Sequence, residues 1–252
     1  GIVEEENSII LYSKPDLTKQ KIESMLHRLV EEKLISSFTV SESFIENKNW
    51  NEEWEKGIQP IEVTDKIVIK PSFKTYNEKE GQIIITIDPK MSFGTGEHQT
   101  TKLVVQLLEK HTPLKGKVLD VGTGTGILAI VSLKLGASKA LAIDNDEWCI
   151  ENAEENISLN NVEDQCSFLL AEINDVIENN YDLVIANIQK NVLLDISGSI
   201  KEKVKNNGLV ILSGLLVHDK VDIISNYQNL GFVLIDEKQM DEWIALVFRL
   251  NN

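Results

Sequence analysis

The feature that most constrains this chain is a strand, a glycine turn and a helix start between residues 117 and 128. Glycine occupies positions 122, 124 and 126, after the apolar run Val118-Leu119-Asp120-Val121. Three such glycines let the backbone pass close to a bound group, and the free N–H groups of the next helix point toward the same place. A second apolar run ends in Asp144, about twenty residues on. Together these elements predict a nucleotide-type site.

From residue 115 onward, apolar runs of strand length alternate with segments of helical periodicity. We expect strands at 117–121, 139–143, 166–171, 181–186 and 208–213, and helices near 126–135, 147–160, 190–205 and 218–229. This alternation predicts a doubly wound parallel α/β sheet. The last two expected strands, 232–237 and 243–250, have a short connection and must therefore pair antiparallel.

The residues before 115 predict a separate small unit and a linker. Residues 1–48 are expected to form an N-terminal α/β domain, with a strand at 8–12, a helix capped by Asp16 that ends near residue 33, and a strand at 35–45. Residues 49–61 are expected to form a linker helix with Trp50 and Trp54 on one face. The domain 62–252 should then begin with strands at 66–71 and 82–87 and a helix from 101 to about 110.

The charge balance limits the partners, because 40 acidic residues face 25 lysines and arginines, for a net charge of −15. A protein that binds nucleic acid through its phosphates normally carries a basic face. The acidic charge of this chain instead favours a basic protein partner, because opposite charges attract. The alternative is that the acidity serves solubility alone. The sequence has no apolar run long enough for a membrane span and no signal-peptide pattern. Cys149 and Cys166 lack metal-ligand spacing and are expected to be reduced core residues. We expect a cytoplasmic monomer without a metal.

A second motif is more specific than the glycine turn. Residues 87–101 read Ile-Asp-Pro-x-Met-x-Phe-Gly-Thr-Gly-x-His-x-Thr-Thr, which closely resembles the signature of the PrmA family, methyltransferases of large-subunit ribosomal protein eleven. The glycine spacing at 122–126 resembles motif I of class I S-adenosylmethionine-dependent methyltransferases and differs from the G-x-G-x-x-G of dinucleotide binders. Segments 186–188, 213–215 and 242–243 agree, so that the resemblance covers roughly residues 50–250.

The resemblance implies a Rossmann-like, mostly parallel seven-stranded sheet with a terminal antiparallel hairpin, and a ferredoxin-like N-terminal domain that recognises the substrate. It implies S-adenosyl-L-methionine as cofactor, and lysine side chains of ribosomal protein eleven as methyl acceptors, with α-amino groups as a further class. The cofactor-binding positions that it implies are Phe93, Gly94, Gly96, Thr101, Gly122, Gly124, Asp144 and Asn187. Glu172 or Ile173, at the tip of the third strand, is expected to contact the adenine.

The acceptor amine must lose its proton before it can attack a methyl group. For a lysine with a pKa of about 10.4, this costs roughly 4.6 kcal/mol at pH 7. His98 is the candidate general base by residue type, and the alternative is a structural role in the glycine loop. Asn187 is expected to position the amine, although an amide is not a base. His27, His111 and His218 are expected to be incidental surface residues.

Three other functions stay open on the sequence. The chain could be a class I methyltransferase for another protein or a small-molecule amine, or a ribosome-assembly factor that binds the cofactor without turnover. The third, a dehydrogenase, is opposed by the glycine spacing and by the terminal hairpin.

Overall fold

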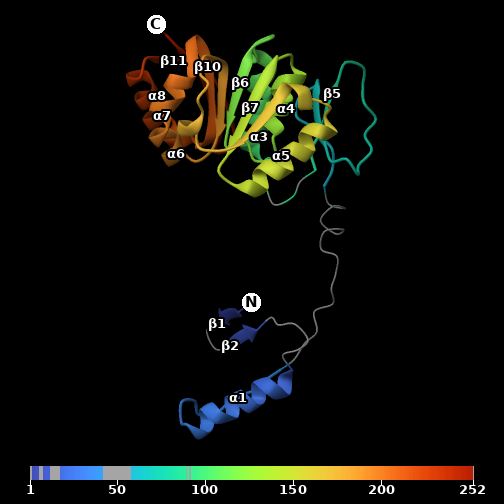
Figure 1. The fold of residues 1–252 in the computed structure, drawn as a ribbon, viewed down its shortest axis with the longest axis vertical. Coiled ribbons are helices and arrows are strands. Elements are labelled where there is room, and N and C mark those ends of the chain that lie inside the picture. Colours follow the sequence, from blue (N-terminus) through green and yellow to red (C-terminus); the bar gives the residue numbers. More distant parts are fainter. Residues whose placement is uncertain are drawn as a thin grey trace. The chain divides into compact units, whose positions relative to one another are not determined.

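The computed structural model describes residues 2–5, 8–11, 18–41, 58–88, 90 and 92–251. The chain divides into two compact units, Gly1–Glu55 and Lys56–Asn252 (Figure 1). In the first unit the described elements are β1 (Ile2–Glu5), β2 (Ser8–Leu11) and α1 (Lys19–Glu31). Strands β1 and β2 pair antiparallel, from Ile2 opposite Leu11 to Glu5 opposite Ser8.

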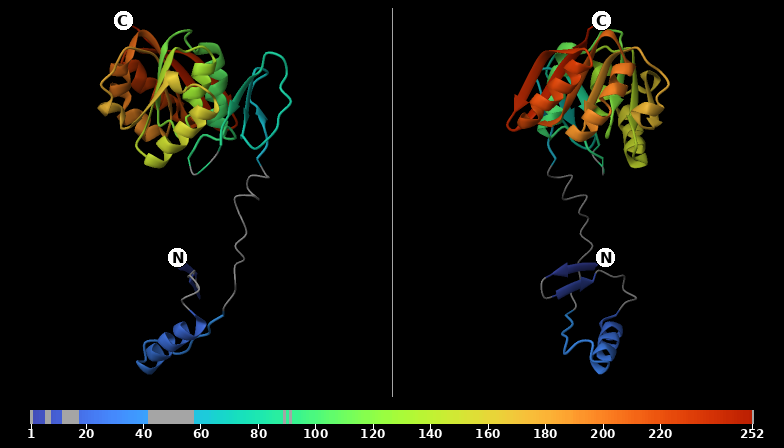
Figure 2. Two further views of the ribbon diagram at one scale, coloured as in Figure 1. Left: turned by 45° about the vertical axis from the view of Figure 1, so that its right-hand side comes forward. Right: turned by 90° about the vertical axis from the view of Figure 1, so that its left-hand side faces the viewer.

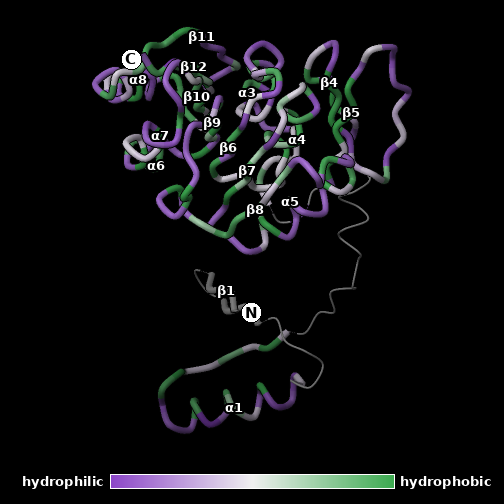
Figure 3. The backbone as a smooth tube through the Cα atoms, turned by 45° about the horizontal axis from the view of Figure 1, so that its top comes forward, coloured by the Kyte–Doolittle hydropathy of each residue, from purple (hydrophilic) through white to green (hydrophobic). Residues whose placement is uncertain are grey.

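Helix α1 is amphipathic, and hydrophilic and hydrophobic residues alternate along it in Figure 3. Its N-cap is Thr18, with extended backbone (φ −80°, ψ 155°), so the expected cap at Asp16, which lies outside the described residues, is wrong. The Met25 side chain on this helix is 64% exposed.

The strand expected at 35–45 is wrong for residues 35–41, which form no regular structure, while 42–45 lie outside the described residues. Strand propensity depends on a partner strand to pack against, and this apolar alternation has none among the described residues. The linker prediction, with Trp50 and Trp54, lies outside the described residues as far as residue 57, and residues 58–60 are not helical. The ferredoxin-like arrangement stays a prediction.

The second unit contains two sheets and the helices that cover them. Its strands are β3 (Ile61–Glu62), β4 (Ile67–Lys70), β5 (Ile83–Thr86), β6 (Lys117–Val121), β7 (Lys139–Asp144), β8 (Cys166–Leu170), β9 (Tyr181–Asn187), β10 (Val204–Leu216), β11 (Phe232–Met240) and β12 (Trp243–Leu250). Its α-helices are α3 (Gln99–His111), α4 (Ile127–Lys134), α5 (Glu147–Leu159), α6 (Lys190–Asp195), α7 (Ser197–Lys203) and α8 (Lys220–Asn229). Short 3₁₀ turns are η1 (Glu163–Gln165), η2 (Ile173–Asp175) and η3 (Val217–Asp219).

The main sheet has the strand order β11-β12-β10-β9-β6-β7-β8. Strands β10, β9, β6, β7 and β8 run parallel, and β12 pairs antiparallel with both β10 and β11. The predicted seven-stranded, mostly parallel sheet with a terminal hairpin is therefore confirmed. The chain leaves β6 in one direction across the sheet and returns to β9 on the other side, and at such a switch point ligands bind beyond the carboxyl ends of the strands.

Both faces of the sheet are covered, which explains why its parallel strands are almost continuously apolar. Helices α3 and α4 bury side chains such as Leu107 and Ile130 against one face, in a cluster that includes the small sheet. On the other face, α7 and α8 bury Ile200, Ile223 and Tyr227. Figure 1 shows α6, α7 and α8 gathered at the opposite end of this unit from β5.

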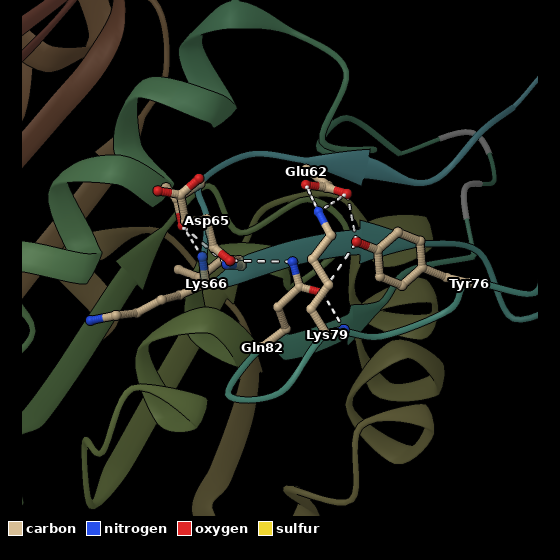
Figure 4. A network of polar contacts seen from close by, with 8 residues as sticks. Glu62, Asp65, Lys66, Tyr76, Lys79 and Gln82 are labelled. Atoms are coloured by element: carbon tan, nitrogen blue, oxygen red, sulfur yellow. Dashed lines mark hydrogen bonds and ion pairs between the residues drawn. The ribbon is translucent and has the colours of Figure 1, made fainter.

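The small sheet, β3-β4-β5, is tied together by a polar network (Figure 4). Its long crossover loop, residues 71–82, extends from the edge of the unit in Figure 2. The Lys79 Nζ lies 2.8 Å from Glu62 Oε2, and the Tyr76 hydroxyl donates to Glu62 Oε1 at 2.7 Å. These bonds lower the pKa of the Glu62 carboxyl. The loop is thus fixed to β3, although parallel strands are usually joined by a helix.

The helix expected at 190–205 is wrong, because two helices, α6 and α7, meet at Ile196 (φ −92°, ψ 4°). Residue 204 already begins β10, where Val204 pairs with Tyr181 of β9. The pairing then shifts register before Leu209, across Asn207 at φ 61°. Strand pairing has overridden helical periodicity here, because periodicity is a local signal and the pairing is a tertiary one.

Candidate functional site

The glycine turn after β6 has a backbone that other residues adopt with difficulty. Gly122, Gly124 and Gly126 have φ of 71°, 55° and 82°, in the left-handed region. A Cβ atom on Gly122 would lie 2.6 Å from Cγ2 of Ile188, and one on Gly124 would overlap the carbonyl oxygen of Phe93. The turn is therefore packed between two neighbouring segments, and glycine is required for close approach as well as for conformation.

One of these segments is residues 92–98, the covering loop. The Thr125 amide donates to the Phe93 carbonyl at 3.0 Å, and the Thr125 hydroxyl donates to the Gly94 carbonyl at 2.7 Å. A Cβ on Gly94 would lie 2.7 Å from Thr125 Oγ1, and one on Gly96 would lie 2.8 Å from Ile69 Cδ1. The structure thus brings the predicted positions 93 and 94 together with the glycine turn, whereas position 96 lies against β4.

Asp144, at the end of β7, holds the turn from the other side. Its Oδ2 accepts a hydrogen bond from the Gly124 amide at 2.9 Å, and its Oδ1 accepts one from the Asp146 amide at 3.1 Å. The sequence predicted only a ligand-binding role for this acid. Strand β7 lies directly beside β6, so an acid at its tip reaches the turn without any ligand.

Asp120 lies beneath the turn and is completely buried. Its Oδ2 accepts from the Thr123 hydroxyl at 2.7 Å and from the Ala129 amide at 3.2 Å. Its Oδ1 is buried with no hydrogen-bond partner among the described residues. Burial raises the pKa of this carboxyl to about 7, because an apolar surrounding disfavours its charged form.

Two more buried oxygen atoms, Thr101 Oγ1 and Asn187 Oδ1, lack partners in the part of the chain that the structure describes. Thr101 lies in the first turn of α3, and Asn187 ends β9; α3 packs on β9, which is hydrogen-bonded to β6. Buried polar atoms are normally paired. Carboxylate and amide oxygens here can accept from the N–H or O–H groups of a ligand, and a hydroxyl can do either, so these residues fit a polar bound group.

His98 caps α3. Its Nδ1 lies 2.8 Å from the Thr100 hydroxyl and 3.3 Å from the Thr100 amide. The ring packs edge-on against Phe93 and Trp243, with centroids 5.4 Å and 4.8 Å away. These contacts support the structural alternative for His98 over the general base. Trp243, at the start of β12, was not predicted as a site residue, although the Glu242-Trp243 pair could have signalled it.

The two residues expected near an adenine differ in exposure. Ile173 is buried in the core beside α7 and α8, whereas Glu172 is exposed and begins η2, where its amide donates to Asp175 Oδ2 at 3.1 Å. Neither is bonded to the glycine turn by any hydrogen bond found among the described residues.

Of the other histidines, the prediction for His111 is wrong. Its side chain is 14% exposed, and its Nε2 lies 2.7 Å from Asp236 Oδ2. The partner is 125 residues away in the sequence, which hid the contact from sequence reasoning. His218 is indeed exposed, as is His27, which packs against Phe38.

Cys149 and Cys166 are free thiols and both are partly buried. Burial raises the pKa of the Cys166 thiol to about 12. No helix that the structure describes is both apolar and long enough to cross a membrane.

Comparison with known proteins gives one consistent family. A family model described as ribosomal protein L11 methyltransferase (PrmA) matches residues 2–251. Relatives from several bacteria carry the name ribosomal protein L11 methyltransferase. The one from Acetivibrio thermocellus is 38% identical over 229 residues, covering 88% of this chain and 73% of the relative. The one from Chlorobaculum tepidum is 37% identical over 254 residues, covering 99% and 88%.

Among solved structures, the chain is similar to the ribosomal protein L11 methylase of Lactobacillus delbrueckii subsp. bulgaricus. The TM-score is 0.72 at 30% identity, and the match covers 77% of this chain and 100% of the other. The fold, the glycine turn and these matches agree with the resemblance carried by residues 87–101. The chain belongs to the ribosomal protein L11 methyltransferase (PrmA) family.

Proposed function

We propose that this protein transfers methyl groups from S-adenosyl-L-methionine to lysine side chains of ribosomal protein L11, with α-amino groups as a further acceptor class. The family match over residues 2–251 is the observation that carries the proposal. The glycine turn supports it, since the tight turn, the acid Asp144 and the covering loop gather at the carboxyl ends of β6 and β7, where sheets of this kind bind nucleotide-type ligands. We expect the reaction to occur in the cytoplasm, by a monomer that needs no nucleic acid.

We infer that the cofactor lies against the glycine turn at Gly122 and Gly124. Asp144 would accept hydrogen bonds from the ribose hydroxyls, because a carboxylate with two oxygens can bind a diol while it keeps the Gly124 amide. Phe93 and Gly94 would border the bound group, since the covering loop is bonded directly to the turn at Thr125. Gly96 would let this loop pass close to β4.

Thr101 and Asn187 would face the reacting end of the cofactor and the acceptor amine. Both have a buried oxygen with no partner among the described residues, which a ligand N–H would satisfy. The cofactor, when bound, supplies an activated methyl group on a sulfonium. The residues of the chain mainly orient the acceptor, an effect that can contribute roughly 7–11 kcal/mol.

The acceptor lysine must be neutral when it reacts. Asn187 can accept a hydrogen bond from the amine and hold it in line, but its amide cannot take the proton. His98 uses its Nδ1 to cap α3. We therefore propose that the amine loses its proton to solvent as it enters the site, and that desolvation lowers its pKa.

We propose that residues 1–48 recognise the protein substrate and are joined through 49–61 to the catalytic domain 62–252. The larger unit contains both apolar clusters described above, so it has its own core. Removing residues 1–48 should abolish methylation of ribosomal protein L11 and leave cofactor affinity unchanged. Loss of cofactor binding in the shortened protein would contradict this division of labour.

The proposal is tested by incubating the protein with labelled cofactor and purified ribosomal proteins, followed by intact-mass analysis. We expect mass increases in steps of one methyl group on ribosomal protein L11. Label on another protein or on a small amine would show that this molecule, and not ribosomal protein L11, is the methyl acceptor. Cofactor binding without any transfer would favour the non-catalytic assembly factor.

A further inference from the structure

Two asparagines on α5 and a third at its C-cap form a buried polar ladder that the proposed function does not use. Asn152, Asn156 and Asn160 are four residues apart, so they lie on one face of the helix. All three are buried. Burying an amide is unfavourable unless it is hydrogen-bonded, so the bonds of this ladder indicate what it is for.

Asn156 and Asn160 bond to backbone outside the helix, whereas Asn152 accepts a bond from Asn156 alone among the described residues. Asn160 accepts from the Thr86 amide at 2.9 Å and donates to the Thr86 carbonyl at 2.6 Å, so it pairs with the end of β5 as a neighbouring strand would. Asn156 accepts from the Asp88 amide at 2.8 Å and donates to the Thr125 carbonyl at 3.0 Å. One side chain therefore joins the segment that enters the covering loop to the glycine turn.

Thr125 is the point where these bonds meet. Its amide and hydroxyl hold the covering loop at Phe93 and Gly94, and its carbonyl is held by Asn156. The side chain of Asp88 is fixed as well as its amide, because the carboxylate accepts hydrogen bonds from the amide and the hydroxyl of Ser72, both at 2.6 Å. Asp88 ahead of the covering loop is thus tied directly to Asn156, and Phe93 and Gly94 within the loop are tied to it through Thr125.

We propose that Asn156 is a positioning residue, which fixes the covering loop over the glycine turn and thereby sets the affinity for the cofactor. This inference rests on the proposed function, because it takes S-adenosyl-L-methionine as the ligand of the turn. Asn156 bonds to the backbone of Asp88 and Thr125 and to the side chain of Asn152, so its effect on the cofactor is transmitted through Thr125 and the loop.

The first test measures amide hydrogen exchange in the ligand-free, full-length protein. In Asn156→Ala the Thr125 amide should exchange at least about tenfold faster. This amide donates to the Phe93 carbonyl and not to Asn156, so faster exchange reports an indirect effect on the contact between loop and turn. Tyr227→Phe is the matched control, because it removes a buried bond of 3.0 Å to the Leu193 carbonyl in the other cluster. Unchanged exchange at Thr125 in Asn156→Ala, or equal acceleration in Tyr227→Phe, would overturn the proposal.

The second test measures S-adenosyl-L-methionine binding by calorimetry. Asn156→Ala should weaken binding about fivefold or more, and Tyr227→Phe should leave it unchanged. Asn156→Asp keeps the size of the side chain, and its protonated carboxyl can still donate to Thr125. Its affinity relative to wild type should therefore recover as the pH falls.

The outcomes separate the two claims. A wild-type protein that binds no S-adenosyl-L-methionine would remove the proposed function. If wild type binds S-adenosyl-L-methionine and both Asn156 variants bind it as tightly as wild type at every pH, the positioning role alone is refuted. If Asn156→Ala does not fold, Asn156→Asp at acidic and neutral pH decides the question in its place.

Discussion

The bonds of Asp144 allow the effect of Asp144→Ala on cofactor binding to be worked out. The carboxylate holds the Gly124 amide at 2.9 Å and the Asp146 amide at 3.1 Å, and it is proposed to bind the ribose as well. Hydrogen bonds to a charged group contribute about 1.5–3 kcal/mol each. Because the side chain is only partly buried, we expect a loss of about 1–3 kcal/mol in binding, which is about 5–150-fold in affinity.

Calorimetry with S-adenosyl-L-methionine and with S-adenosylhomocysteine, which lacks the sulfonium charge, measures this loss. Both ligands should weaken equally if hydrogen bonds are responsible. The control is Asp146→Ala, which removes the same charge and a 3.0 Å cap to the Trp148 amide, at about 1 kcal/mol of stability. The ribose assignment fails if Asp144→Ala binds as tightly as wild type, or if Asp146→Ala weakens binding to the same degree.

Three further predictions concern stability. Gly124→Ala should destabilise the protein by at least about 1–2 kcal/mol in urea unfolding, because φ is 55° and the new Cβ overlaps Phe93; Gly198→Ala, which meets no described atom within 4 Å, should be stabilising by about 0.5–1 kcal/mol. Since burial raises the pKa of Asp120 to about 7, its contribution to stability is full below about pH 4 and is lost as the pH rises through 7. In Asp120→Asn the free energy of unfolding should therefore vary less with pH between about 4 and 7. Hydrogen bonds from Lys110 and His111 lower the pKa of Asp236 to about 2, so its contribution is present above about pH 4 and is lost as the pH falls toward 2; Asp236→Asn should cost about 1–2 kcal/mol at pH 7 and almost nothing at pH 2, as measured by urea midpoints.

The parts that sequence reasoning predicted well are those whose signal is local. The apolar run 117–121, the glycine spacing and the acid at 144 each lie within a few residues of the structure they specify, and the structure has β6, the turn and the tip of β7 there. The closing hairpin followed in the same way from a short connection between two apolar runs.

The parts that failed depend on partners far along the chain. His111 was expected to be a surface residue because nothing in its neighbourhood indicates Asp236. The asparagines of α5 look like polar surface positions, although their spacing of four is visible, because their partners lie in β5 and the glycine turn. The helix at 190–205 failed for the same reason, since the pairing of Val204 with Tyr181 decides where it ends.

The unpartnered oxygens of Thr101 and Asn187 link the stability of the folded protein to the binding of its ligand. A buried polar atom without a partner destabilises the folded state by about 1–3 kcal/mol, and these two belong to residues of α3 and β9, which pack together beside β6. A ligand that satisfies them binds the folded chain and not the unfolded one, so it shifts the folding equilibrium by RT ln(1 + [L]/Kd). When the ligand is scarce, more of the chain is unfolded and open to proteolysis. The abundance of the protein would then follow the supply of its own cofactor.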